Sequence, residues 1–404
     1  MIQPKQTQLQ FLDWEFGVFF HFGIRAFFKG SKDWDGIPMP VETFNPESLD
    51  CDSWIAAAKS AGARYAILTC KHHDGFANWP TAYSDYSVAS SPYKDGKGDI
   101  VREFVDACRK GDMKVGLYYS PAQWGGAIDF SSAKEYDDYF VGQITELLTG
   151  YGKIDYLWFD ACGSGDHKYD RVRIINTIRS LQPDILIFNM WDPDVRWVLN
   201  EDGVAPSPCF ATATETDMDR FAPRFMPAEC DCKIRSTWFD CEDNEDTLKS
   251  LDELVGMYEY SVGRGCNFLL NVGPNRHGLI NESDAKRLAE LGAEISRRYD
   301  HPLEFTRDGM TISYVGKPTT ERGGCLVNTA VISEDLTKGE AVVSYRLYAR
   351  VAAYKMPICV HRGDQIGHKA IVHFPAIQTD RLWIEVEEKC GEVKIADIKA
   401  YYID

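Results

Sequence analysis

Short apolar segments alternate with amphipathic segments over most of this chain, and this alternation limits the fold more than any other feature. The apolar segments, which read as buried strands, cover residues 16–22, 64–70, 114–120, 156–160 and 185–189. Amphipathic stretches at 52–61, 99–110, 133–151 and 168–181 have helical spacing and fill the intervals. Strands that are apolar along nearly their whole length are typical of a parallel sheet covered by helices on its outer face. The alternation therefore predicts a (β/α)8-type barrel.

Later segments supply the remaining units of this barrel. Strands are expected at residues 210–215, 233–238 and 267–271, with helices at 247–262 and 283–298. A doubly wound open sheet is the main rival architecture. However, no GxGxxG or GxxxxGK[ST] loop follows any predicted strand, so nucleotide binding has no support.

The pattern changes after residue 302. Short alternating runs at 310–314, 341–347, 370–374 and 382–387 are separated by turn residues, which predicts antiparallel strands. We therefore expect a catalytic barrel over residues 1–302 and a small C-terminal β-sandwich over residues 303–404.

Charge and composition exclude several classes of partner. The chain has 404 residues and a formal net charge of −17, which argues against nucleic acid and against an anionic membrane. No segment has the length and apolar character of a membrane span or the charge order of a signal peptide, so the expected location is cytoplasmic. The 12 cysteines show no metal-type spacing and are expected as reduced thiols. An oligomer is possible.

Polar side chains gather where the predicted strands end. Asp160 ends the segment Tyr156-Leu157-Trp158-Phe159-Asp160, and burial of an ionised carboxylate is costly unless partners compensate it. Because function in such barrels lies at the carboxyl ends of the strands, these side chains are expected to share one face. The set is His21, His72, His73, Tyr118, Tyr119, Trp158, Asp160 and Asn271.

The adjacent histidines 72 and 73 allow two interpretations. Neighbouring side chains on a strand point to opposite faces, so both face one centre only if the strand bulges there. A metal site would need further ligands at matching spacing, and the sequence supplies none. Hydrogen bonding to a polyhydroxy ligand is the favoured use, and no metal is expected.

Cleavage of a glycosidic bond needs a second carboxyl group besides Asp160. One group attacks or stabilises the sugar, and the other protonates the leaving oxygen. Three later acids qualify, namely Glu201, Glu215 and Glu229, and the residue pattern alone does not separate them.

Seven motifs in register carry a family resemblance over about residues 10–300. They are HFG at 21–23, Asp33-Trp34, KHHDGF at 71–76, WFD at 158–160, PDVRWVLNE at 193–201, MPAECD at 226–231 and NFLLNVGPNRHG at 267–278. Together they resemble the α-L-fucosidases of glycoside hydrolase family 29. The resemblance implies a barrel followed by a β-sandwich, retaining hydrolysis, and no metal or organic cofactor.

The resemblance also assigns roles. Asp160 matches the family's nucleophile, and Glu201 matches the acid/base of the subfamily that acts on branched α-1,3/1,4-fucosides, with Glu229 as the second choice. The residues expected to bind substrate are His21, Trp34, His72, His73, Tyr118, Tyr119, Trp158, Arg196, Glu229 and Trp238.

The expected function is therefore that of a retaining exo-α-L-fucosidase that releases L-fucose from fucosylated oligosaccharides or glycoconjugates. Ala161 and Leu199 stand where the family has glycine, and Asp33 where it more often has glutamate. Because glycine allows backbone angles that alanine and leucine resist, these departures bear on linkage specificity. Two alternatives are a catalytically silent carbohydrate-binding protein and a hydrolase of a related sugar such as α-L-galactose.

Overall fold

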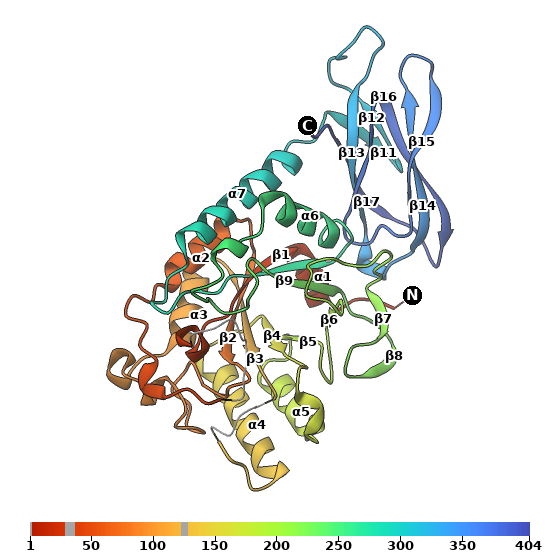
Figure 1. The fold of residues 1–404 in the computed structure, drawn as a ribbon. Coiled ribbons are helices and arrows are strands. Elements are labelled where there is room, and N and C mark those ends of the chain that lie inside the picture. The colour runs from red at the N-terminus through yellow and green to blue at the C-terminus, as the bar shows by residue number, and fades with distance from the viewer. Residues whose placement is uncertain (1, 29–36, 123–127) are drawn as a thin grey trace.

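A computed structural model describes residues 2–28, 37–122 and 128–404 of the chain. Figure 1 shows a barrel formed by the N-terminal three quarters of the chain and an antiparallel sheet formed by the rest. The C-terminus lies beside the C-terminal sheet near the end of α7 (Glu282–Tyr299), where Asp404 pairs with Arg297 at 2.8 Å (Figure 1).

The barrel is an eight-stranded parallel sheet in the order β5-β4-β3-β2-β1-β10-β9-β6. A bridge between Phe188 and Val195 joins its two edges, so the sheet is nearly closed. The strands are β1 (Phe16–Phe20), β2 (Tyr65–Lys71), β3 (Lys114–Tyr119), β4 (Tyr156–Phe159), β5 (Leu186–Phe188), β6 (Arg196–Trp197), β9 (Ala228–Lys233) and β10 (Asn267–Asn271). The predicted barrel is confirmed.

Helices cover the outside of the barrel between most of the strands (Figure 1). They are α1 (Gln6–Trp14), α2 (Cys51–Ser60), α3 (Ile100–Lys110), α4 (Ala133–Gly150), α5 (Arg171–Leu181), α6 (Leu251–Ser261) and α7 (Glu282–Tyr299). The N-cap side chains Asp50, Asp99, Ser132, Asp170 and Ser250 accept hydrogen bonds from first-turn backbone N–H groups, which stabilises these starts. Short 3-10 turns occupy Ile24–Phe27, Val41–Thr43, Val88–Ser90, Tyr93–Gly96, Ser164–Asp166, Glu245–Thr247 and Leu336–Lys338.

Two of the predicted barrel strands are wrong. The segment 210–215 contributes β7 (Thr212–Glu215), which pairs with β8 (Arg220–Phe225) as an antiparallel hairpin outside the barrel. The segment 233–238 mostly follows β9, and β6 had not been expected. β9 is poorly apolar because its buried residues include Glu229 and Asp231, so periodicity did not reveal it.

The C-terminal part is an antiparallel sheet of seven strands with its own apolar core. Its long strand β16 pairs with β13 through its first half and with β12 and β14 through its second half, so it belongs to both parts of the folded sheet. The strands are β11 (Phe305–Asp308), β12 (Thr311–Tyr314), β13 (Cys325–Glu334), β14 (Val342–Val351), β15 (Met356–Gly363), β16 (Ala370–Lys389) and β17 (Ile395–Tyr401). The predicted second, antiparallel β region is confirmed.

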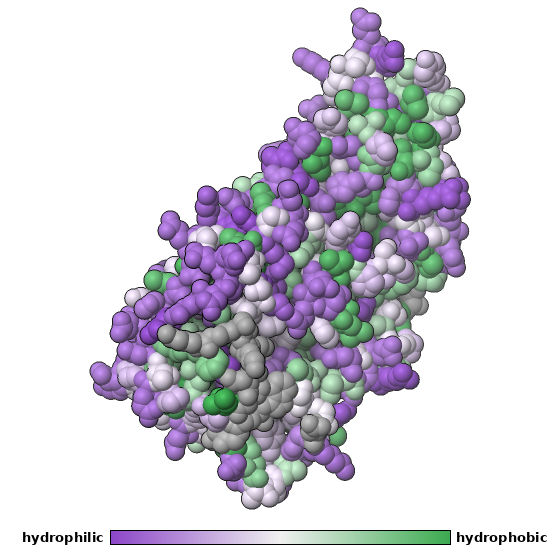
Figure 2. All heavy atoms as spheres, viewed as in Figure 1, coloured by the Kyte–Doolittle hydropathy of each residue, from purple (hydrophilic) through white to green (hydrophobic). Residues whose placement is uncertain are grey.

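The surface visible in Figure 2 is mainly hydrophilic, in keeping with the acidic composition. Apolar residues are scattered over it, with several on the C-terminal sheet. None of the helices in the described part of the chain combines the length and the apolar composition that crossing a bilayer requires.

Candidate active site

A cavity of about 340 Å³ opens at the carboxyl ends of the barrel strands, which is within the range of small-ligand sites. Loops after β1, β2, β4, β5, β6 and β9 contribute to it, together with one residue of the β7–β8 hairpin. Its lining residues are Phe19, His21, His72, His73, Tyr118, Trp158, Asp160, Ala161, Cys162, Phe188, Asn189, Trp197, Glu201, Asp217, Asp231 and Trp238.

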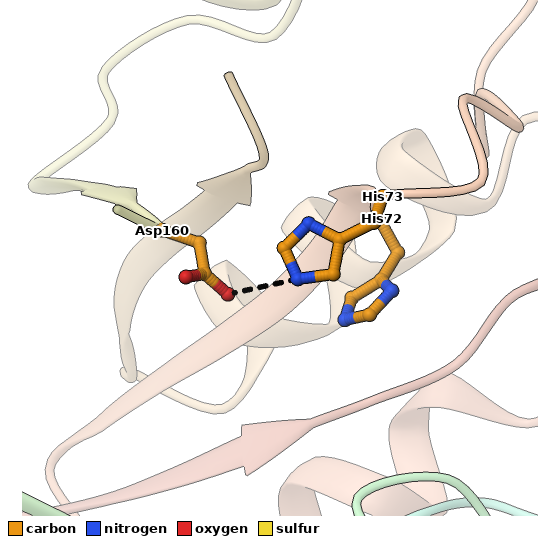
Figure 3. A group of neighbouring side chains, drawn as sticks. All are labelled: His72, His73 and Asp160. Atoms are coloured by element: carbon orange, nitrogen blue, oxygen red, sulfur yellow. Dashed lines mark ion pairs between the residues drawn. The ribbon is translucent and has the colours of Figure 1, made fainter. Parts of the chain in front are cut away.

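Asp160 lies at the wall of this cavity, directly after β4. Its carboxylate accepts hydrogen bonds from the Tyr118 hydroxyl at 2.8 Å and from the Cys162 backbone N–H at 2.9 Å. The Nε2 atom of His73 lies 3.5 Å from the same carboxylate (Figure 3). Tyr118 and His73 face the Oδ2 atom and the Cys162 N–H faces the Oδ1 atom, so the orientation of the carboxylate is fixed.

His72 and His73 both line the cavity although they are adjacent in sequence. The register of β2 on β3 shifts between Thr69 and Lys71. A strand irregularity of this kind is needed for two adjacent side chains to face the same cavity. Figure 3 shows His73 directed toward Asp160 and His72 beside it. Burial lowers the pKa of both imidazoles, so both are neutral at pH 7 and can donate one hydrogen bond and accept another.

His21 completes the histidine cluster from the end of β1. Burial lowers its pKa to about 3, although its hydrogen bond to Asn271 acts in the opposite direction. The His21 Nδ1 atom lies 2.7 Å from the Asn271 side-chain oxygen, and the ring centre lies 4.8 Å from that of Trp238. Three neutral imidazoles and an indole face thus surround the cavity.

Trp158 is held in place from below by Glu229. The indole N–H donates to Glu229 at 2.9 Å, and the ring stacks on Phe188 with centres 4.2 Å apart. Glu229 is fully buried and also accepts hydrogen bonds from the hydroxyls of Tyr65 and Tyr156. Burial raises the pKa of Glu229 to about 7, despite these three donors. Glu229 therefore lies beneath the cavity and orients its wall.

Glu201 reaches the cavity from the loop after β6. Its carboxylate forms an ion pair of 2.6 Å with Lys233 at the end of β9, and the Lys233 ammonium lies 4.7 Å from the ring centre of Trp238. Leu199, which replaces a family glycine, has φ = 68° and a 61% exposed side chain. The backbone of Leu199 adopts the left-handed conformation that glycine favours. This conformation is strained for leucine, because its Cβ atom comes too close to the following carbonyl oxygen.

The structure separates the three candidates for the second acid. Glu201 lines the cavity with Asp160. Glu229 lies beneath Trp158, and Glu215 is exposed on β7 and paired with Arg220 at 3.4 Å. Among these three, Glu201 alone shares the cavity.

Two other predicted binding residues lie away from the cavity lining. Tyr119 points to the opposite face of β3 from Tyr118, and its hydroxyl donates to Gln143 of α4 at 2.8 Å. The Arg196 guanidinium donates to the carbonyl of Phe210 at 2.9 Å, so it secures the segment before β7. Trp34 and its neighbour Asp33 lie outside the described residues.

Sequence reasoning missed several residues of the cavity wall. Asn189 and Trp197 lie just past β5 and within β6, and a search of every strand end would have found them. Asp231 is almost fully buried, accepts a hydrogen bond of 2.6 Å from the Trp197 indole, and has a pKa raised well above its usual value by burial. Asp217 lies in the turn between β7 and β8, and the sequence analysis predicted the strand at 210–215 but not the hairpin that brings this turn to the cavity.

His72, His73 and Asp160 each place one potential ligand atom within 4.8 Å of the others. A search of the described residues finds this one group of three. The Asp160 carboxylate already accepts hydrogen bonds from Tyr118 and Cys162, and His73 Nδ1 lies 2.6 Å from the Ser120 hydroxyl, whereas a closed tetrahedral metal site needs four protein ligands. The expected absence of a metal cofactor stays a prediction.

A parallel barrel that gathers carboxylates, neutral imidazoles and indole rings around one small cavity has the layout of a glycoside hydrolase. The comparisons narrow this class. The family model for α-L-fucosidase matches residues 40–298. The chain belongs to the α-L-fucosidase family, glycoside hydrolase family 29.

Individual relatives agree with this assignment. The chain is similar to α-L-fucosidase 1 of Arabidopsis thaliana, with 38% identity over 306 residues that cover 71% of this chain and 59% of that protein. This chain thus matches somewhat more than half the length of that relative. A structure from Bacteroides thetaiotaomicron has a TM-score of 0.89 and 28% identity, with full coverage of both chains. A glycoside hydrolase 29 family member from an unknown rumen bacterium has a TM-score of 0.87 and 30% identity, and the match covers 99% of this chain and 77% of that one.

Proposed function

We propose that the protein is a retaining exo-α-L-fucosidase that releases L-fucose from fucosylated oligosaccharides or glycoconjugates. The observation that carries this proposal is that Asp160 and Glu201, which are 41 positions apart in sequence, line one cavity together with three histidines. The small volume of the cavity, about 340 Å³, supports binding of a single terminal sugar.

The histidine cluster and the aromatic rings supply complementary contacts for a deoxyhexose. Neutral His21, His72 and His73 can hydrogen-bond to ring hydroxyls as donors or acceptors. The indole faces of Trp158 and Trp238 suit the apolar edge of the sugar, which for fucose includes the methyl group at C5.

The proposed reaction has two displacements. Asp160 attacks the anomeric carbon while Glu201 transfers a proton to the glycosidic oxygen, and a covalent fucosyl-enzyme forms. Water then attacks the same carbon, and Glu201 takes its proton, so the sugar leaves with its original anomeric configuration. A retaining enzyme holds the two carboxyl groups about 5 to 5.5 Å apart, and we expect this spacing in the complex with substrate.

The ion pair with Lys233 has a consequence for the first step. The Glu201 carboxylate contacts the Lys233 ammonium at 2.6 Å in this structure, whereas in the first step the same carboxyl group has to face the leaving oxygen and give it a proton. Glu201 must therefore leave this ion pair when substrate binds. The ionised form is the one needed in the second step, in which Glu201 acts as the base.

We further propose specificity for α-1,3 and α-1,4 linkages. Glu201 lies in the segment that matches the acid/base of the branched-linkage subfamily, and it is half-exposed at the cavity mouth, which leaves room for a branched leaving group. Faster cleavage of branched fucosylated trisaccharides than of linear α-1,2-linked ones would support this proposal, and the reverse order would contradict it.

The nucleophile is tested by Asp160→Ala with an activated aryl α-L-fucoside. We expect a loss of at least about 1,000-fold in kcat, because removal of a covalent nucleophile removes the first displacement. Azide should restore turnover and give the β-fucosyl azide, because azide attacks from the face that Asp160 occupied. Nuclear magnetic resonance of the product reads the configuration.

Glu201→Ala serves as the matched variant. Azide should rescue it with the α-fucosyl azide, since the covalent intermediate on Asp160 still forms. Substantial activity of Asp160→Ala without azide, or α-fucosyl azide from that variant, would refute the assignment.

A further inference from the structure

Asp217 is the one residue of the cavity wall that the β7–β8 hairpin contributes. The hairpin lies outside the barrel sheet and occupies the interval between β6 and β9, where a regular barrel unit would have a helix. Its turn extends far enough to bring a carboxylate to the mouth of the cavity. The other acids of the lining come from segments that directly follow barrel strands or from the strands themselves.

The turn that carries Asp217 is held in a defined conformation. The side chain of Thr216 accepts a hydrogen bond from the backbone N–H of Asp219 at 3.2 Å, and the Thr216 backbone N–H donates to the Asp219 carbonyl at 2.9 Å. The Asp219 carboxylate accepts from the Trp191 backbone N–H at 3.2 Å and pairs with Arg171 of α5 at 2.5 Å. These contacts fasten the turn to the barrel, so Asp217 is positioned before any ligand arrives.

Asn189 supports Asp217 from the barrel side. Its side-chain amide donates to Asp217 at 2.7 Å, and its backbone has φ = 69°, a left-handed conformation that asparagine tolerates better than most residues. Asn189 is 2% exposed and lines the cavity. Its Oδ1 atom is buried and has no hydrogen-bond partner among the described residues.

The Asn189 Oδ1 atom is shielded from the cavity, so Asn189 acts through its amide N–H, which donates to Asp217 at 2.7 Å and fixes that carboxylate at the cavity wall. Asp217 offers carboxylate oxygens that only accept. Asp217, oriented by Asn189, can therefore accept hydrogen bonds from ligand hydroxyl groups.

The position of this pair determines which part of the substrate it meets. Asn189 follows β5, between Asp160 after β4 and Glu201 after β6, whereas the histidine cluster lies on β1 and β2. In the proposed reaction the fucosyl unit occupies the histidine side, and the bond that breaks lies between Asp160 and Glu201. The space next to Asn189 and Asp217 is thus on the side of the leaving group.

We propose that Asp217 binds hydroxyl groups of the sugar to which the fucose is attached, that Asn189 positions Asp217 for this contact, and that both residues determine specificity for an oligosaccharide leaving group. This inference rests on the proposed fucosidase activity and names the substrate class more closely. An aryl leaving group has no hydroxyl groups to donate, so it gains nothing from the pair.

The experiment compares two substrates, 4-nitrophenyl α-L-fucoside and a branched trisaccharide with an α-1,4-linked fucosyl branch. The variants are Asp217→Ala and Asn189→Gly, since glycine keeps the left-handed backbone while it removes the amide. We expect the ratio of kcat/KM for the trisaccharide to kcat/KM for the aryl fucoside to fall by roughly 10-fold or more in each variant, the effect of losing a hydrogen bond to a charged or buried group. The decrease should appear mainly as a higher KM for the trisaccharide.

Glu215→Gln is the matched control, because Glu215 lies on the same hairpin, is exposed, and does not line the cavity. It should leave the ratio unchanged within about twofold, in line with the small effects of surface substitutions. Thermal unfolding of each variant checks that the hairpin has not lost its structure.

The outcomes separate the two proposals. If the wild type cleaves both substrates and the ratio is unchanged in both variants, the assignment of Asn189 and Asp217 is overturned while the fucosidase activity stands. Equal losses on both substrates also overturn it, because the pair would then act on the fucosyl unit. If the wild type cleaves neither substrate, the proposed function itself fails, and this assignment fails with it.

Discussion

Burial shifts the pKa values of Glu229 and of the histidines around the cavity. Glu229 shows this most clearly, because three hydrogen-bond donors surround it and its pKa is still raised to about 7 by burial. The histidines are affected in the opposite sense, since burial penalises the charged form of each group. The site is thus lined by neutral rings that can recognise hydroxyl groups.

Glu229 makes stability depend on pH. A carboxyl whose pKa is raised from 4.5 in the unfolded chain to about 7 in the folded protein contributes stability that is present below pH 4.5 and is lost as the pH rises through 7. Glu229→Gln removes this ionisation. We therefore expect the free energy of unfolding of the wild type, relative to that of the variant, to fall by about 2–3 kcal/mol between pH 5 and pH 8.

Urea unfolding of both proteins over this pH range measures the difference. A difference that is constant with pH would show that Glu229 has the same pKa in the folded and unfolded states. Tyr65→Phe keeps the acid while it removes one donor, so it should make the pH dependence steeper.

Strand β3 carries one tyrosine that faces the cavity and one that packs against a helix. Tyr118 and Tyr119 are adjacent, so they point to opposite faces of the strand. The Tyr118 hydroxyl donates to Asp160, whereas the Tyr119 hydroxyl donates to Gln143 and ties β3 to α4. The motif alone could not distinguish the two roles.

The corresponding phenylalanine variants should separate activity from stability. Tyr118→Phe is expected to lower kcat/KM about 10-fold or more, because Asp160 loses one of its two donors. Tyr119→Phe is expected to lower the free energy of unfolding by about 1–2 kcal/mol, because it leaves the buried Gln143 oxygen without its donor, and to change kcat/KM by less than about twofold. Steady-state kinetics and urea unfolding of both variants test this. A larger loss of activity in Tyr119→Phe than in Tyr118→Phe would contradict the assignment of faces.

At the scale of the whole molecule, Glu15 connects the barrel to the C-terminal sheet. It lies between α1 and β1 and forms ion pairs with Lys369 and, at 3.5 Å, with His368, both just before β16. Burial alone would raise the pKa of Glu15, but these two partners lower it to about 2. The ionised form therefore stabilises the junction between the two parts.

The sign of the pH effect is opposite to that of Glu229. A depressed pKa contributes stability that is present above pH 4.5 and is lost as the pH falls through about 2. Glu15→Gln should lower the free energy of unfolding by about 1–3 kcal/mol at pH 7, and the difference from the wild type should shrink as the pH falls below 4.5. Calorimetry from pH 3.5 to pH 7 provides the measurement.

Asp397→Asn, which removes an exposed ion pair with Lys399, is the control and should lower the free energy of unfolding by less than about 0.5 kcal/mol. An equal effect of both substitutions would argue against a special role for the junction.

The sequence predicted the architecture well where strands are apolar and helices are regular. The strands from β1 to β5 and β10, and the helices from α2 to α7, lie close to their expected positions. The prediction failed at β6 and β9, because β6 is two residues long and β9 buries two carboxylates, so neither resembles an apolar strand. A pattern of apolar residues along the sequence predicts a buried strand only where the core is apolar throughout. The centre of this barrel also contains buried carboxyl groups, so the pattern is lost there.

Predicted strand ends were sufficient to name Asp160, His21, His72 and His73 as candidates, because a barrel brings the carboxyl ends of its strands to one face, whereas Glu201 was named through the family resemblance. Tertiary structure alone decided that Glu229 supports Trp158 from below, that Tyr119 faces α4, and that Asp217 enters the cavity from a hairpin outside the sheet. The physical reason is that the order of residues along the chain fixes which end of a strand a residue occupies. How deeply its side chain is buried, which neighbour it faces and which distant segment it contacts depend on how the closed sheet packs.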